Sequence, residues 1–248
     1  MRFGLFERYL SADRQAILQS KRPDVTFADK AVFYFLGLQP PSQPLPGSVE
    51  TMNPYQSAEV QSVVRGFYRR FFNDNEPRTL VLGINPGRLG GGTTGISFTD
   101  PVNLQNHCGI AHQMAPKTEL SSRFVYRCIE AFGGAEKFYA HFYLGALYPL
   151  ALVKDGKNYN YYDNAEVYAA LKPEIMDSLQ RQAGLGSKKD TICLGQKNHA
   201  YLKSLNHEMR LFDKIHVLDH PRFIMQYRSR QVDEYVDKYL NAFAACLR

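Results

Sequence analysis

The sequence lacks several features that mark specialised classes of protein. No apolar run approaches the roughly 20 residues that a membrane-spanning helix needs, so we expect no association with a membrane. The N-terminal residues 1–8 are interrupted by charge too early for a secretory signal peptide, which predicts a cytoplasmic location. The four cysteines share no Cys-x-x-Cys or other short Cys/His spacing, and we therefore expect no metal site and no cofactor. Their apolar neighbours predict buried, reduced thiols.

What the sequence does contain fits a single globular unit. Its 248 residues suffice for one large domain, and 44% hydrophobic with 22% charged residues are ordinary proportions for such a chain. We expect residues 1–248 to form one domain that acts as a monomer, with residues 1–55 as a helical and proline-rich extension packed on it. The net charge of +6 favours a polyanionic partner, although a basic enzyme without such a partner would carry the same charge.

Short apolar segments alternate with segments of helical periodicity along most of the chain. The segments that predict strands are 79–84, 142–148, 191–195 and 215–219. The segments that predict helices are 1–21 (one or two short helices), 57–72, 121–132 with Ser121 as its cap, a stretch beginning near Pro173 as a first-turn proline, 197–206 and 232–243. Because each strand is apolar on both faces, the pattern predicts an α/β protein, with a three-layer α/β/α sandwich around a central four-stranded, mainly parallel sheet.

Two polar residues follow predicted strands at positions where α/β enzymes place reactive groups. Asn85 ends the first predicted strand and opens a glycine-rich loop over 86–95, and His220 follows the last predicted strand. In parallel sheets the ligand binds outside the carboxyl ends of the strands, so we expect both side chains at one edge of the sheet, together with a loop over 149–162. Each residue also has a plainer interpretation, because Asn-Pro-Gly is a common turn and a histidine before proline is often an ordinary loop residue.

The glycine-rich loop does not match two common phosphate-binding motifs. A P-loop needs a lysine followed by serine or threonine, and residues 86–95 contain no lysine. A dinucleotide fingerprint needs a helix straight after its glycines, whereas residues 96–101 predict an extended loop. Phe98 lies in this loop with little to pack against, so we interpret it as a candidate stacking platform for a planar ligand. The segment 158–162 combines amides with tyrosines, and it fits a ligand-binding segment and a partly buried tyrosine cluster equally well.

Two motifs of the chain resemble those of the uracil-DNA glycosylase superfamily, and of its single-strand-selective monofunctional branch in particular. In that branch the first motif runs Gly-hydrophobic-Asn-Pro-Gly and then Thr-Gly-x-x-Phe, which residues 83–87 and 94–98 match. The second motif begins with His-Pro after the last strand, as residues 220–221 do. The resemblance spans residues 79–246 and implies the same three-layer parallel α/β fold.

The resemblance implies a monofunctional DNA glycosylase that hydrolyses the N-glycosidic bond of a deaminated base flipped out of DNA. Uracil is the first expected substrate, with hypoxanthine or xanthine as alternatives, and the expected partner is DNA, either single-stranded or a damaged duplex. Phe98 would stack on the base, Asn85 would orient the attacking water, and neutral His220 would donate a hydrogen bond to the departing base. The candidate residues are Asn85 and His220 for catalysis, Gly83, Ile84, Pro86, Gly87, Phe98 and Asn158 for binding the base, and Arg88, Pro221, Arg222, Phe223 and Arg228 for binding DNA.

Two departures from the family pattern leave the choice of base open. The asparagine that reads the uracil edge in the family lies three residues before a proline, and Ala146 occupies that place here. Asn158 or Asn160 is a candidate replacement. After the His-Pro pair, residues 222–227 do not follow the family's Ser-Pro-Arg-Asn order. Two other functions stay open, a non-catalytic nucleic-acid-binding module and a nucleotide enzyme that holds phosphates in the glycine-rich loop, although the missing lysine argues against the second.

Overall fold

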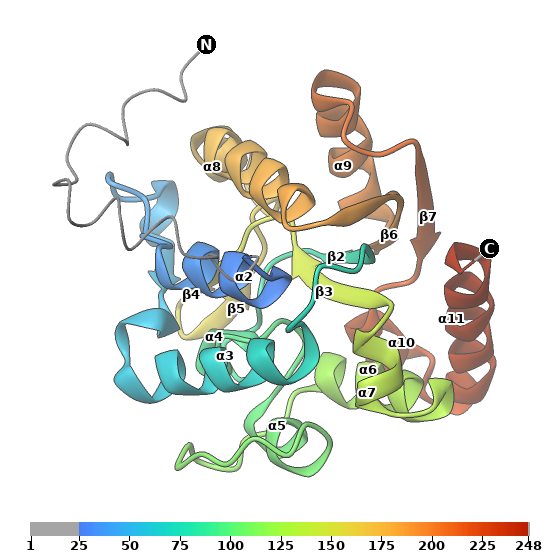
Figure 1. Ribbon diagram of the computed structural model, residues 1–248. Helices are drawn as coiled ribbons and strands as arrows, with labels where there is room; N and C mark the ends of the chain where they lie inside the picture. The colour runs from blue at the N-terminus through green and yellow to red at the C-terminus, as the bar shows by residue number, and fades with distance from the viewer. Residues whose placement is uncertain (1–24, 248) are drawn as a thin grey trace, which may run out of the picture.

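A four-stranded parallel sheet forms the centre of the molecule. The computed structural model describes residues 25–247 (Figure 1), so the short helices expected in residues 1–21 lie outside the described residues. The strands are β2 (Arg78–Gly83), β3 (Phe142–Ala146), β6 (Ser187–Leu194) and β7 (Lys214–Leu218), hydrogen-bonded in the order β3-β2-β6-β7. All three pairings are parallel. The predicted strands and the predicted parallel sheet are thus confirmed, with shifts of a few residues at the strand ends.

Helices cover both faces of this sheet. α6 (Leu120–Phe132) lies between β2 and β3 in the chain, α8 (Ala165–Gly184) between β3 and β6, and α9 (Gln196–Met209) between β6 and β7. Because the chain reverses direction across the sheet after β3, right-handed crossovers place α6 on one face and α8 with α9 on the other, as Figure 1 shows. α11 (Val232–Cys246) packs beside α6. The expected three-layer sandwich is confirmed.

Shorter elements complete the described chain. They are α2 (Phe27–Leu36), η2 (Pro46–Ser48), β1 (Glu50–Met52), η3 (Pro54–Gln56), α3 (Ala58–Phe71), α4 (Gly91–Thr94), α5 (Pro101–Asn106), α7 (Ala135–Tyr139), β4 (Ala151–Lys154), β5 (Lys157–Tyr159), α10 (Pro221–Tyr227) and η4 (Ser229–Gln231). Part of the glycine-rich segment therefore forms a helical turn, α4, before the loop that carries Phe98. None of the helices in residues 25–247 combines the length and apolar character that crossing a membrane requires.

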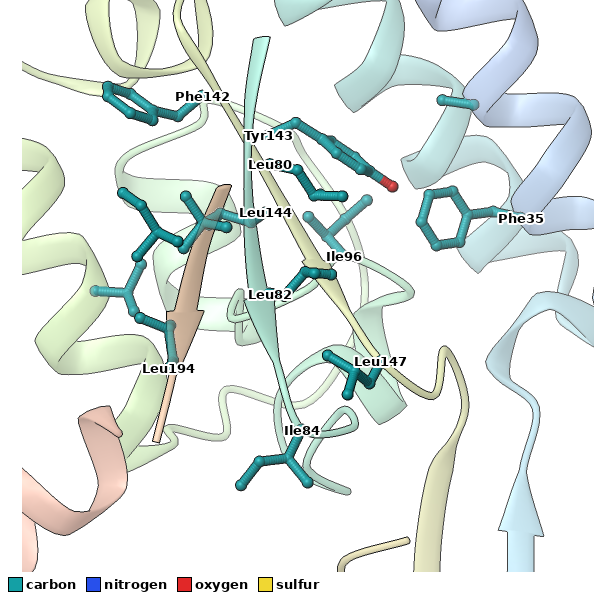
Figure 2. Packing of buried hydrophobic residues seen from close by; sticks show 14 of the residues in the cluster. Phe35, Leu80, Leu82, Ile84, Ile96, Phe142, Tyr143, Leu144, Leu147 and Leu194 are labelled. Atoms are coloured by element: carbon teal, nitrogen blue, oxygen red, sulfur yellow. The ribbon is translucent and has the colours of Figure 1, made fainter. Parts of the chain in front are cut away.

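The core explains why the two strands β2 and β3 need no polar face. All residues of both strands are buried, and side chains along a strand point alternately to the two faces of the sheet. Figure 2 shows Leu80 and Tyr143 on the side that faces Phe35 of α2, with Leu144 on the opposite side. A leucine buried to this extent contributes about 2 kcal/mol to folding. The four cysteines are also buried free thiols, which confirms that prediction.

α8 begins earlier than the sequence predicted. Its first residue is Ala165, and the Asn164 side chain caps it by accepting hydrogen bonds from two backbone N–H groups of the first turn. Pro173 therefore lies inside the helix, and the prediction that it occupies the first turn is wrong. A proline inside a helix removes one backbone hydrogen bond and costs about 3 kcal/mol. The full burial of Leu171 and Ile175, on either side of Pro173, offsets this cost.

The start of α6 also differs from the prediction. Glu119 is its N-cap, whereas Ser121, predicted as the cap, is buried inside the first turn. The Glu119 side chain makes no capping hydrogen bond. Its carboxyl is therefore free to occupy another environment, which proves to be the cavity described below.

The segment 149–162, expected as a loop, forms a β-hairpin instead. β4 and β5 pair antiparallel and are joined by Asp155 and Gly156, which both have positive φ. Asp-Gly is a typical sequence for such a two-residue turn, so the signal was present in the chain. β1 pairs with β4, so the proline-rich extension contributes a strand to a small second sheet. The hairpin brings residues 159–161 into hydrogen-bonding contact with Asn85.

Candidate active site

A cavity of about 300 Å³ lies at the carboxyl edge of the four-stranded sheet. This volume is at the lower end of the roughly 300–1,000 Å³ that is usual for small-molecule sites. Its lining comes from the ends of β2, β3 and β7 and from β5, α6 and α10. The predicted residues that it brings together are Gly83, Ile84, Asn85, Pro86, Gly87, Phe98, Asn158, His220, Arg222 and Phe223. Arg88, Pro221 and Arg228 were also predicted, and they are not among the lining residues.

Backbone groups hold the Asn85 side chain in one orientation. Its Nδ2 donates a hydrogen bond to the Tyr159 carbonyl (3.0 Å), and its Oδ1 accepts one from the Tyr161 N–H (3.2 Å). Both partners come from the chain at the end of the β4–β5 hairpin. Because a carbonyl oxygen has two lone pairs, Oδ1 can accept a second hydrogen bond from a water molecule in the cavity.

A buried hydrogen-bond chain ties the hairpin to the end of β2. The Tyr161 hydroxyl donates to Asn198 Oδ1 (2.8 Å), and Asn198 Nδ2 donates to the Gly83 carbonyl (3.0 Å). The side chains of Tyr161 and Asn198 are both fully buried. Tyr161 therefore connects two parts of the site, since its backbone holds Asn85 and its side chain is anchored to the strand from which Asn85 follows.

His220 is held as a neutral imidazole with a defined tautomer. It caps α10, where its Nδ1 accepts a hydrogen bond from the Arg222 backbone N–H (3.2 Å). An accepting Nδ1 leaves the proton on Nε2. Burial, together with the nearby Arg222 guanidinium, lowers the pKa of His220 to about 4. At neutral pH the side chain is therefore an uncharged Nε2–H donor.

The ring of Phe98 approaches the end of β2 closely. A Cβ on residue 83 would overlap the Phe98 ring, so Gly83 is required for this approach. The ring centroid of Phe98 lies 6.1 Å from that of His220. Phe98 has a φ of 56°, a strained value for a residue with a side chain. The Thr94 hydroxyl, which donates to the Thr99 carbonyl (2.6 Å), closes the loop around it.

The two asparagines expected to replace the amide missing at Ala146 differ in their freedom to bind a ligand. All three residues line the cavity. Asn158 Oδ1 accepts a hydrogen bond from the Arg88 backbone N–H (2.9 Å), which leaves its Nδ2 protons available. Asn160 Nδ2 instead donates to the Asp163 carboxylate (3.0 Å). The geometry favours Asn158 as the donor to a ligand.

Sequence reasoning missed Glu119, whose half-buried carboxyl also lines the cavity. Its two oxygens lie against the backbone of Gly87 and Gly90, so closely that a Cβ on either residue would overlap them. Burial raises the pKa of Glu119 to about 7, while nearby Arg222 lowers this pKa and Asp100 raises it. An acidic residue before a helix is usually an exposed cap, so the sequence carried no signal for this position.

Only some of the residues predicted to contact DNA line the cavity. Arg222 and Phe223 line it, together with Tyr227, which the sequence had not indicated. Phe223 and Tyr227 are exposed and lie 5.6 Å apart between ring centroids. The Arg228 guanidinium lies over the Phe223 ring, 5.5 Å from its centroid. Pro221 is buried as the first residue of α10, where it supports the helix rather than presenting a surface.

Comparison with known proteins identifies the family of the chain. A model of the uracil-DNA glycosylase superfamily matches residues 70–244. No curated protein sequence matches the chain. Among solved structures, the crystal structure of wild-type SMUG2 from Pedobacter heparinus is 41% identical, with a TM-score of 0.84, and the match covers 89% of this chain and 97% of that one. The chain therefore belongs to the uracil-DNA glycosylase superfamily.

Proposed function

We propose that the protein is a monofunctional DNA glycosylase that hydrolyses the N-glycosidic bond of a deaminated base. Uracil is the first candidate, and hypoxanthine or xanthine are the alternatives. The observation that carries the proposal is that Asn85 and His220, far apart in the sequence, line one cavity together with the ring of Phe98. Membership of the superfamily supports the same reaction.

The target base must leave the DNA stack to reach this cavity. Flipping costs a few kcal/mol, and it costs least in a single strand or at a mispair. Stacking of a base on an aromatic ring such as Phe98 returns about 1–3 kcal/mol. The partner is accordingly single-stranded DNA or damaged duplex.

Hydrogen-bond donors in the cavity favour deaminated bases. Deamination replaces an exocyclic amino group, which donates hydrogen bonds, with a carbonyl oxygen, which accepts them. Asn158 presents Nδ2–H donors because its Oδ1 is already bonded to the Arg88 N–H. Such a donor binds the new carbonyl oxygen. With an undamaged base it would face the original amino group, which is also a donor, and both groups would be buried without an acceptor.

Bond cleavage uses the two side chains at the strand ends. As the C1′–N bond breaks, negative charge develops on the base and positive charge on the sugar. The His220 Nε2–H donates to the departing base, and removing such a donor typically costs about 3–4 kcal/mol of transition-state stabilisation. Asn85 holds the attacking water in position. Within the described residues no lysine lines the cavity, so the reaction proceeds without an imine and leaves the strand intact.

The test is base release from DNA containing uracil, hypoxanthine or xanthine, in single strands and in duplexes, with abasic sites revealed by alkaline cleavage. Asn85→Ala and His220→Ala should each lower release by about 100-fold or more. Asn241→Ala and His207→Ala, at exposed positions outside the cavity, are the matched controls. DNA binding without release by the wild type would identify a non-catalytic binding module instead, and full activity in both site variants would refute their assignment.

A further inference from the structure

The cavity holds a carboxyl group that the reaction described above does not use. We propose that Glu119, as a carboxylate, accepts the proton that the attacking water loses while Asn85 holds that water in place. This inference rests on the proposed function, since it concerns the same reaction in the same cavity. It supplies the proton acceptor that the amide of Asn85 cannot provide, because an amide is too weak a base.

The position of the Glu119 carboxyl supports this role. It lines the same cavity as Asn85 and His220. Its oxygens lie against Gly87 and Gly90, and both positions must be glycine to admit them. Gly87 follows Asn85 by two residues, so the carboxyl lies beside the loop that presents the water-holding amide.

Among the described residues no ion pair holds this carboxyl, although the Arg222 guanidinium is near enough to lower its pKa. Within residues 25–247 no hydrogen bond reaches it, although Glu119 is the N-cap of a helix. The Glu119 backbone N–H donates to Asp100 Oδ2 (2.9 Å), which fixes the main chain and leaves the side chain in the cavity. A half-buried carboxyl without a hydrogen-bond partner is unfavourable for stability, and such groups in a cleft are typical of functional sites.

The reaction balances with Glu119 as the acceptor. The C1′–N bond breaks, and its electron pair leaves with the base, whose negative charge the His220 Nε2–H stabilises. The water oxygen forms the new bond to C1′, and the water proton passes to the carboxylate, which becomes a carboxylic acid. Before this transfer the carboxylate also stabilises the positive charge on the sugar, which lowers the barrier to cleavage.

The groups around Glu119 set the pH at which it can accept a proton. Burial raises the pKa of Glu119 to about 7, Arg222 on α10 lowers this pKa, and Asp100 before α5 raises it. Arg88, on the glycine loop, does not line the cavity, and His220 stays neutral because its own pKa is lowered to about 4. DNA phosphates raise the pKa of the carboxyl further. The rate of excision should therefore increase as the pH rises through 7 and above.

A single-turnover excision assay on uracil in single-stranded DNA tests the proposal, from about pH 5 to about pH 9, with wild type and Glu119→Gln. Glutamine keeps the shape of the side chain and cannot accept the proton. We expect the rate to fall about 100-fold at high pH and its rise with pH to disappear. Binding of the same strand with an uncleavable uracil nucleotide should change little. Glu130→Gln, on the same helix and outside the cavity, is the matched control.

Two results would overturn the assignment of Glu119. One is a Glu119→Gln rate within about threefold of the wild type across the pH range. The other is a lower rate with an unchanged pH profile, which would show a structural role only. Melting temperatures of both variants identify any loss of folding. If the wild type releases no base at any pH, the proposed function itself fails, and this outcome is distinct from the other two.

Discussion

Burial shifts the pKa values of the imidazole and the carboxyl that line the cavity in opposite directions. It lowers the pKa of His220 to about 4 and raises that of Glu119 to about 7, because it drives each group toward its neutral form. For His220 the result is a hydrogen-bond donor that carries no charge at neutral pH. For Glu119 the result is a carboxylate that reduces the stability of the folded protein whenever it is ionised.

A pH-dependent change in stability follows for Glu119→Gln. A carboxyl whose pKa rises on folding, here from 4.5 to about 7, loses its contribution to stability as the pH rises through that interval. We therefore predict that Glu119→Gln raises the melting temperature more at about pH 8 than at about pH 5, since glutamine does not titrate. Thermal unfolding at both pH values checks this, with Glu130→Gln as the control. An equal shift at both pH values would contradict it.

The sequence predicts which residues line the cavity where polar side chains follow strand ends. Asn85 and His220 could be placed there because each follows an apolar strand and begins a recognisable motif. Phe98 could be identified because it stands alone in a polar loop. Glu119 could not be placed in this way, because its position depends on the contact between its carboxyl and Gly87, and no local pattern encodes that contact.

At the scale of elements, the β4–β5 hairpin positions the candidate water-holding amide. The hairpin gives Asn85 two backbone partners, and Tyr161 anchors the hairpin through Asn198 to the end of β2. The Asp-Gly pair at 155–156 signalled the turn, but strands of three or four residues are too short for periodicity to reveal. The prediction for Pro173 was wrong for a related reason. Local preference places a proline at the start of a helix, but tertiary burial keeps Pro173 inside α8.

We predict that Tyr161→Phe slows excision without weakening DNA binding. The change leaves Oδ1 of buried Asn198 without a hydrogen-bond donor, which costs about 1 kcal/mol of positioning and corresponds to about a fivefold lower single-turnover rate. If Tyr161 acts through Asn85, the same change has no further effect in an Asn85→Ala background. Tyr168→Phe, a neighbour in the same aromatic cluster, is the control. Additive effects in the double variant would show that Tyr161 acts elsewhere.

At the scale of the whole molecule, the site lies at one edge of a layered fold whose far edge carries no part of it. The layers could be predicted from apolar strands alternating with helices, because burial on both faces of a sheet leaves few other arrangements. The small sheet of β1, β4 and β5 could not be predicted in this way, because β1 comes from a proline-rich segment and pairs with a strand far along the chain. The net charge of +6 does not reveal which surface is basic, and this becomes clear only when the fold places the arginines around α10.

We predict that Arg228→Gln weakens DNA binding equally for damaged and undamaged strands. Loss of one phosphate contact should reduce the slope of log Kd against log salt concentration by about 1. Arg181→Gln is the control, since Arg181 is exposed, ion-paired with Asp177 and close to the C-terminal end of α8, at the opposite edge of the sheet. Titrations at several salt concentrations measure the slope. An unchanged slope for Arg228→Gln would remove this residue from the DNA-binding surface.

The two hydrogen bonds that hold the Asn85 side chain affect which sequence changes the hairpin can accept. The two groups that hold this amide are a carbonyl and an N–H of the main chain, which every amino acid except proline supplies. Most exchanges of residue type at position 159 therefore leave the hold on the amide intact, whereas the loss of one residue from the hairpin would shift the register and release it. We therefore expect relatives of this protein to keep the length of the hairpin more strictly than its residue types.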